Sequence, residues 1–70
     1  MGKLKSFFLN GQKYYTNYNL TLADLINYFS YNISLLVLEY NGLIWNKKNW
    51  NKTLIKNKDK IEIVTIVGGG

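Results

Sequence analysis

The stretch that decides the fold is Ile61-Glu62-Ile63-Val64-Thr65-Ile66-Val67-Gly68-Gly69-Gly70. Residues 61–67 are apolar at nearly every position, which predicts a β-strand in the middle of a sheet, or one covered on one face by a partner. Three glycines follow it directly, and they have no side chains to pack and lose much conformational entropy when ordered. We therefore expect a folded domain over residues 1–67 and a flexible tail over residues 68–70.

Side chains alternate between the two faces of a strand, so the residues of this strand fall into two sets. Glu62 is charged and is seldom buried without a partner, so its face is predicted to be the open one. Val64 and Ile66 share that face, and of the two neighbouring phenylalanine rings near the N-terminus we expect Phe8 to point outward. Exposed apolar neighbours on a small domain typically mark a partner site. The predicted docking patch is Val64, Ile66 and Phe8; the alternative register would bury Glu62 against a lysine.

The first part of the chain predicts a β-hairpin. Residues 4–9 have the composition of a strand, and Asn10-Gly11 is a strong signal for a tight turn because both residues tolerate positive φ. Residues 12–16 then form the return strand, with tyrosines suited to a pleated surface.

A helix is predicted to begin after Thr21. Thr21 and Asp24 have the spacing of a capping box, which also places a negative charge at the helix N-terminus. The apolar residues that follow recur at helical spacing and predict one core-facing stripe. This stripe consists of Leu22, Leu25, Ile26 and Phe29. We expect the helix to end at Ser30 or Tyr31.

The rest of the chain alternates apolar runs with polar turns. The predicted elements are a strand over 33–40, a tight turn at Asn41-Gly42, a short strand over 43–45, a loop or single helical turn over 46–52 held by Trp50, a brief edge strand over 53–55 and a turn over 57–60. Two hairpins around one helix must share a core, since none of them buries its apolar face alone. We predict an α+β fold of the β-grasp (ubiquitin-like) type. Its mixed sheet has one covering helix, with Ile61 and Ile63 beneath that helix.

Composition excludes most kinds of catalysis by this chain. It has no Cys and no His, so disulfides, zinc clusters and histidine-based nucleophile systems are excluded. The four side-chain carboxylates show no catalytic spacing; they are Asp24, Glu39, Asp59 and Glu62. We expect neither an enzyme nor a bound cofactor or metal.

The net charge of +5 comes from nine lysines, with no arginine. Arginine is the preferred reader of phosphates and bases, and the many Asn, Lys, Ile, Tyr and Phe codons suit an AT-rich genome. We therefore expect no nucleic-acid partner. No apolar run approaches the length that spans a bilayer, so we expect no membrane partner either.

The glycine tail is the part of the sequence that indicates chemistry. Residues without a Cβ can thread a narrow channel and carry the carboxylate of Gly70 into the active site of another protein. No side-chain nucleophile is present in the tail to attack that carboxylate once it is activated.

The chain resembles the ThiS family of sulfur carriers over nearly its whole length. The matching pieces are Leu9-Asn10-Gly11, Thr21-Leu22-Ala23-Asp24-Leu25, Val37-Leu38-Glu39-Tyr40-Asn41-Gly42, Trp50 and the run from Asp59-Lys60-Ile61 into the glycines. The abundance of Asn and Lys and the positive net charge depart from the family pattern. That departure concerns the surface, whereas the tail fits.

The resemblance implies a two-stage cycle on Gly70. An E1-like adenylyltransferase would join the Gly70 carboxylate to AMP at the expense of MgATP. Sulfur from a donor such as a cysteine desulfurase would then convert it to a thiocarboxylate, which thiazole synthase would use in thiamine biosynthesis. Gly68 and Gly69 would thread the partner's channel with Gly70. Such a carrier would work in the cytoplasm or the plastid stroma.

Two other functions stay open at this point. A carrier of the type of the molybdopterin-synthase small subunit has the same fold and tail, usually on a longer chain. A ubiquitin-like protein modifier, or a plain interaction module, belongs to a different class and would be recognised by covalent lysine conjugates.

Overall fold

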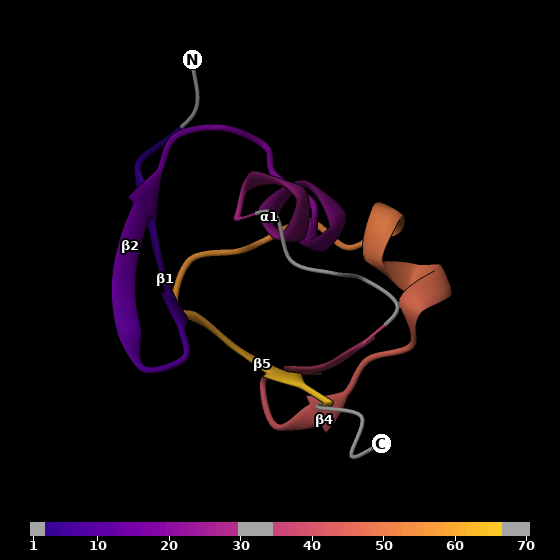
Figure 1. Cartoon of the computed structure of the whole chain (residues 1–70). Helices are drawn as coiled ribbons and strands as arrows, with labels where there is room; N and C mark the ends of the chain where they lie inside the picture. Colours follow the sequence, from indigo (N-terminus) through magenta and orange to yellow (C-terminus); the bar gives the residue numbers. More distant parts are fainter. Residues whose placement is uncertain (1–2, 30–34, 67–70) are drawn as a thin grey trace.

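Apart from one predicted edge strand, the strands and helices follow the order predicted from the sequence (Figure 1). The computed structural model describes residues 3–29 and 35–66. The strands in these ranges are β1 (Lys5–Leu9), β2 (Gln12–Thr16), β3 (Leu36–Tyr40), β4 (Leu43–Ile44) and β5 (Asp59–Thr65). The helices are α1 (Leu22–Tyr28) and the 3-10 helix η2 (Lys47–Lys52).

β5 lies in the middle of the sheet, whose strand order is β2-β1-β5-β3-β4. It runs parallel to β1 and antiparallel to β3, and the other neighbouring pairs are antiparallel. α1 crosses one face of this mixed sheet (Figure 1). The predicted α+β, β-grasp fold is confirmed, including the central position of the last strand beside the first.

Both hairpins turn on an Asn-Gly pair in the left-handed region. The φ angles are 51° and 82° at Asn10 and Gly11, and 51° and 85° at Asn41 and Gly42. Positive φ at both central residues matches the right-handed twist of the flanking strands, which is why this dipeptide selects a two-residue hairpin. The side chain of Asn10 also accepts a hydrogen bond from the backbone N–H of Ile63, at 2.8 Å, and so fastens the first turn to β5.

α1 begins with the predicted capping box. The N–H of Asp24 donates to Thr21 Oγ1 at 3.1 Å, and the N–H of Thr21 donates to Asp24 Oδ2 at 3.0 Å. The helix ends at Tyr28, with Phe29 as its C-cap, so the predicted end at Ser30 or Tyr31 was too late. Residues 27–29 are Asn, Tyr and Phe, which have low helix propensity and therefore favour an early end of the helix.

The core lies between α1 and the sheet. Leu22, Leu25 and Ile26 are buried from the helix, and Phe29 is half-buried at its end. Ile61 and Ile63 meet them from β5, as predicted. The remaining core side chains are Phe7, Leu9, Leu36, Leu38, Tyr40, Trp50 and Ile55.

Segments in the second half differ from the prediction. Residues 33–34 of the predicted third strand lie outside the described residues, and the strand itself starts at Leu36. β4 is shorter than predicted and ends at Ile44, although the Trp45 N–H still donates to Leu38 O of β3 at 2.9 Å. The ring of Trp45 packs against the core, and its Nε1–H donates to Thr53 Oγ1 at 2.9 Å. The region around Trp50 is the predicted helical turn, with the indole buried.

The predicted edge strand over 53–55 is wrong. Leu54 pairs with Thr21 in an isolated bridge that belongs to none of the strands. Its neighbours bond to the segment that enters α1: the N–H of Leu22 donates to Thr53 O at 3.0 Å, and the N–H of Ile55 donates to Leu20 O at 2.8 Å. These backbone groups therefore hold the helix entrance and do not extend the sheet.

Candidate functional site

The end of β5 is the candidate site because it leads toward the glycine tail. Gly68, Gly69 and Gly70 lie outside the described residues, as does Val67. The site is therefore built from β5 and the strands beside it, which fix the direction in which the chain approaches the tail.

β5 divides its side chains between the two faces as the alternation predicted. Ile61 and Ile63 are buried under α1, whereas Glu62 is exposed. Val64 is 57% exposed and Ile66 is 54% exposed. The alternative register, with Glu62 buried against a lysine, is therefore wrong. Two apolar side chains stand in solvent directly before the tail.

The register of β3 adds a residue that sequence reasoning missed. Val37 lies opposite Val64, and its neighbours on β3, Leu36 and Leu38, are both buried. Val37 is half-buried. We name Val37, Val64 and Ile66 the open-face patch. The alternation of Leu36, Val37 and Leu38 would have shown the outward direction of Val37, but only the strand register shows that it meets Val64.

Phe8 also faces away from α1, but it lies elsewhere on the open face. It is half-buried and sits opposite Lys60 of β5 and Lys13 of β2. Because Lys60 precedes Val64 by four residues, Phe8 is roughly 13 Å from Val64 along the strand direction. The Nζ atom of Lys13 lies 5.9 Å from the Phe8 ring centroid, so a cation already covers part of this ring. Phe8 is thus separate from the open-face patch.

Two glutamates lie between Phe8 and the open-face patch. Glu39 and Glu62 are directly opposite each other on β3 and β5. We name them the acidic pair. The open face of the sheet therefore changes along β5 from lysine, to glutamate, to exposed aliphatic side chains.

The start of β5 is fixed by a buried carboxylate. Asp59 is 6% exposed and accepts hydrogen bonds from the Tyr40 hydroxyl, from Asn41 Nδ2 at 3.1 Å and from the Lys56 N–H at 2.7 Å. Burial raises the pKa of the Tyr40 phenol above its ordinary value of 10.0, and the hydrogen bond to Asp59 adds to the rise. The sequence predicted a turn over residues 57–60, whereas Asp59 is buried at the first position of β5, so this network was not predicted. It anchors the strand at the end opposite the tail.

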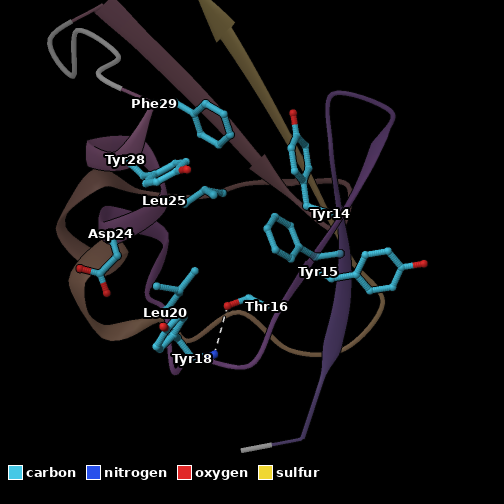
Figure 2. A pocket seen from close by; sticks show the side chains of 10 residues that line it. Tyr14, Tyr15, Thr16, Tyr18, Leu20, Asp24, Leu25, Tyr28 and Phe29 are labelled. Atoms are coloured by element: carbon cyan, nitrogen blue, oxygen red, sulfur yellow. Dashed lines mark hydrogen bonds between the residues drawn. The ribbon is translucent and has the colours of Figure 1, made fainter.

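A groove lies between β2 and α1, on the face of the sheet that the helix covers (Figure 2). This groove has a volume of about 500 Å³ and aromatic walls. Tyr14 and Phe29 meet edge to face across it, with ring centroids 5.7 Å apart. Among the described residues that line it, Asp24 alone is charged, and its carboxylate already caps α1. The groove offers contact surface and no acid, base or nucleophile system.

Within residues 3–29 and 35–66, no group of three or more His, Cys, Asp or Glu side chains could hold a metal ion. In the same ranges, no helix is long and apolar enough to cross a membrane.

The arrangement of sheet and helix has a counterpart in a solved structure. A five-stranded mixed sheet with one covering helix is also the fold of thiamine biosynthesis protein ThiS from Geobacter metallireducens. That crystal structure superposes with a TM-score of 0.78 at 20% sequence identity, covering 93% of this chain and 99% of the other. At this level of identity the likeness establishes the fold.

The sequence then gives the family. The model of the ThiS family matches residues 7–70, so the match runs from β1 through the glycine tail. The chain belongs to the ThiS family.

Relatives with higher identity come from three algae. The uncharacterized protein ycf40 of Trieres chinensis is 68% identical over 66 residues, which cover 94% of this chain and 90% of the relative. The uncharacterized proteins ycf40 of Porphyra purpurea and Pyropia yezoensis are 36% and 31% identical over 62 residues, covering 89% of this chain and 87% of each relative.

Proposed function

We propose that this protein is a sulfur carrier that works through the carboxylate of Gly70 and supplies sulfur for thiazole formation in thiamine biosynthesis. The observation that carries the proposal is the family match over residues 7–70, which includes all three glycines of the tail. The exposed open-face patch directly before the tail supports it, because a partner must hold the domain while the tail enters its active site.

The chemistry begins with a carboxylate, which is a poor acyl donor. In the proposed cycle an oxygen of Gly70 attacks the α-phosphorus of MgATP in an E1-like adenylyltransferase, and pyrophosphate leaves. A persulfide sulfur from a donor such as a cysteine desulfurase then attacks the acyl carbon, and AMP leaves. A thiol cleaves the donor's S–S bond, and Gly70 keeps one sulfur as a thiocarboxylate for thiazole synthase.

In this cycle the chain is a co-substrate and not an enzyme. MgATP belongs to the activating enzyme, and the carrier needs to hold no cofactor. We place the cycle in the cytoplasm or the plastid stroma, where the carrier and its enzymes would meet.

The direct test is the intact mass of the protein purified from its own cells. Exchange of one oxygen for sulfur at Gly70 raises the mass by the difference between the two atoms, and fragmentation places the change on the last residue. Alkylation of the thiocarboxylate in the same preparation identifies the sulfur as nucleophilic. Lysine-linked conjugates would instead indicate a protein modifier.

A deletion tests whether Gly70 is the reacting residue. The chain lacking Gly70 should lose ATP–pyrophosphate exchange with the activating enzyme, because its carboxylate no longer reaches the α-phosphorus. Its thermal unfolding should match that of the full chain, since the described core ends before the tail. Full exchange activity of the shortened chain would contradict the mechanism.

A further inference from the structure

The acidic pair places two of the few negatively charged side chains of this basic protein next to each other. The chain has four Asp and Glu residues against nine lysines. Two of the four are occupied within the fold, because Asp24 caps α1 and Asp59 is the hydrogen-bonded core carboxylate. The other two, Glu39 and Glu62, are placed opposite each other on neighbouring strands of the open face.

This placement is unfavourable for the isolated domain. The Cβ atoms of residues directly opposite on antiparallel strands are roughly 5 Å apart, and like charges at such positions destabilise the sheet. Neither glutamate side chain has a hydrogen bond or ion pair with any residue in the described ranges. Lys60 is on the same strand and face as Glu62, yet no ion pair joins them. Within residues 3–29 and 35–66, therefore, no side chain compensates the repulsion.

The surroundings of the acidic pair indicate what kind of group fits over it. On the tail side lie Val37 and Val64, which offer an apolar contact. On the other side lie Lys60 and Lys13, flanking Phe8. A cation above Glu39 and Glu62 would interact with both carboxylates, whereas an anion would be repelled.

From this charge complementarity we infer that the activating enzyme presents a basic side chain, arginine or lysine, which docks between Glu39 and Glu62 when the open-face patch is covered. The inference rests on the proposed function and adds the chemistry of the partner's surface. The apolar contact supplies area beside the tail. The cation fixes how the carrier is positioned along β5, so that the tail is aimed at the ATP site.

The test is the steady-state kinetics of ATP–pyrophosphate exchange with the E1-like adenylyltransferase of the same organism, varying the carrier. Relative to the unaltered chain, the double variant Glu39→Gln, Glu62→Gln should raise KM for the carrier about tenfold, with kcat unchanged. Added salt should raise KM steeply for the unaltered chain and much less for the variant. Free of partner, the variant should melt at the same or a higher temperature, because the like-charge contact is gone.

A matched control separates local from overall charge. Asn51→Lys raises the net charge by one unit, as each Glu→Gln change does, but on exposed η2, which packs beside α1 and away from the open face (Figure 1). The single variants Glu39→Gln and Glu62→Gln are measured beside it, so that every variant compared differs from the unaltered chain by one unit of charge. KM should rise for each glutamine variant and stay constant for Asn51→Lys.

Two results would overturn the inference. An unchanged KM in the double variant, with the unaltered chain fully active, would remove the basic contact and leave the carrier function standing. An equal rise in KM for Asn51→Lys would reduce the effect to overall charge. If the unaltered chain supports no exchange at all, the proposed function fails and the inference fails with it.

Discussion

Asp59 shows how one residue can fix the position of a strand. A carboxylate in the core of a small domain is costly unless its oxygens are hydrogen-bonded, and here the donors are Tyr40, Asn41 and the backbone of Lys56. The donors come from β3, from the second Asn-Gly turn and from the segment before β5. The carboxylate therefore joins parts of the chain that hydrophobic packing alone would not hold in register.

The raised pKa of Tyr40 predicts a loss of stability in alkali. The folded state keeps the phenolic proton above pH 10, where the unfolded state releases it, so the free energy of unfolding falls as pH rises above about 10. Below that pH this group contributes its full stabilisation. Tyr40→Phe should flatten the alkaline fall while lowering stability at pH 7 by about 1–3 kcal/mol, because Asp59 loses a donor. Urea unfolding between pH 7 and 11 measures both effects.

Tyr18→Phe is the matched control for that experiment. It removes the same hydroxyl from a ring that is 71% exposed, and it leaves Asp59 untouched. Its alkaline profile should follow that of the unaltered chain. A Tyr40→Phe profile with the same alkaline slope would contradict the assignment.

At the scale of the elements, local signals predicted most of the fold. The two Asn-Gly turns, the capping box at Thr21 and the alternation of β5 each have a local physical cause, and each is found. The edge strand over 53–55 failed for a different reason. Its backbone forms hydrogen bonds with the segment that enters α1. This pairing depends on the path of the chain after η2, which the residues 53–55 do not determine by themselves.

The contact between α1 and the sheet makes a measurable prediction. Leu25 is 3% exposed and its side chain belongs to the core between the two layers. Leu25→Ala should lower the free energy of unfolding by about 2–5 kcal/mol, since it removes buried methyl groups and leaves a cavity. Leu43→Ala removes the same atoms from a 63% exposed position on β4 and should cost under about 0.5 kcal/mol. Equal losses in urea unfolding would contradict the layer arrangement.

At the scale of the whole molecule, the two faces of the sheet differ in character. One face carries the core under α1, and the other carries exposed Val64 and Ile66, the acidic pair and two lysines. The sequence predicted that Val64 and Ile66 are exposed, because the alternation of side chains between the two faces can be worked out from a single strand. It did not predict Val37, the opposition of Glu39 and Glu62, or the distance of Phe8 from the patch, because these depend on the register between strands.

This separation predicts that docking can be damaged without unfolding. Val64→Asp should raise KM for the carrier in the adenylation assay and leave kcat and the melting temperature nearly unchanged, because the side chain is largely exposed before docking and buried after it. Leu4→Asp makes a comparable change at a 67% exposed residue outside β5 and should leave the kinetics unaltered. Unchanged kinetics for Val64→Asp would show that the open-face patch is not a docking surface.

The central place of β5 has a consequence for how the protein folds. β1 pairs with β2, and β3 with β4, but only β5 joins these two hairpins into one sheet. Every pairing across the middle of the sheet therefore links segments far apart in the chain, and such high contact order slows folding. During synthesis both hairpins leave the ribosome before β5 and cannot yet pair with each other. Cooperative folding of the sheet therefore requires β5 to pair with β1 and β3.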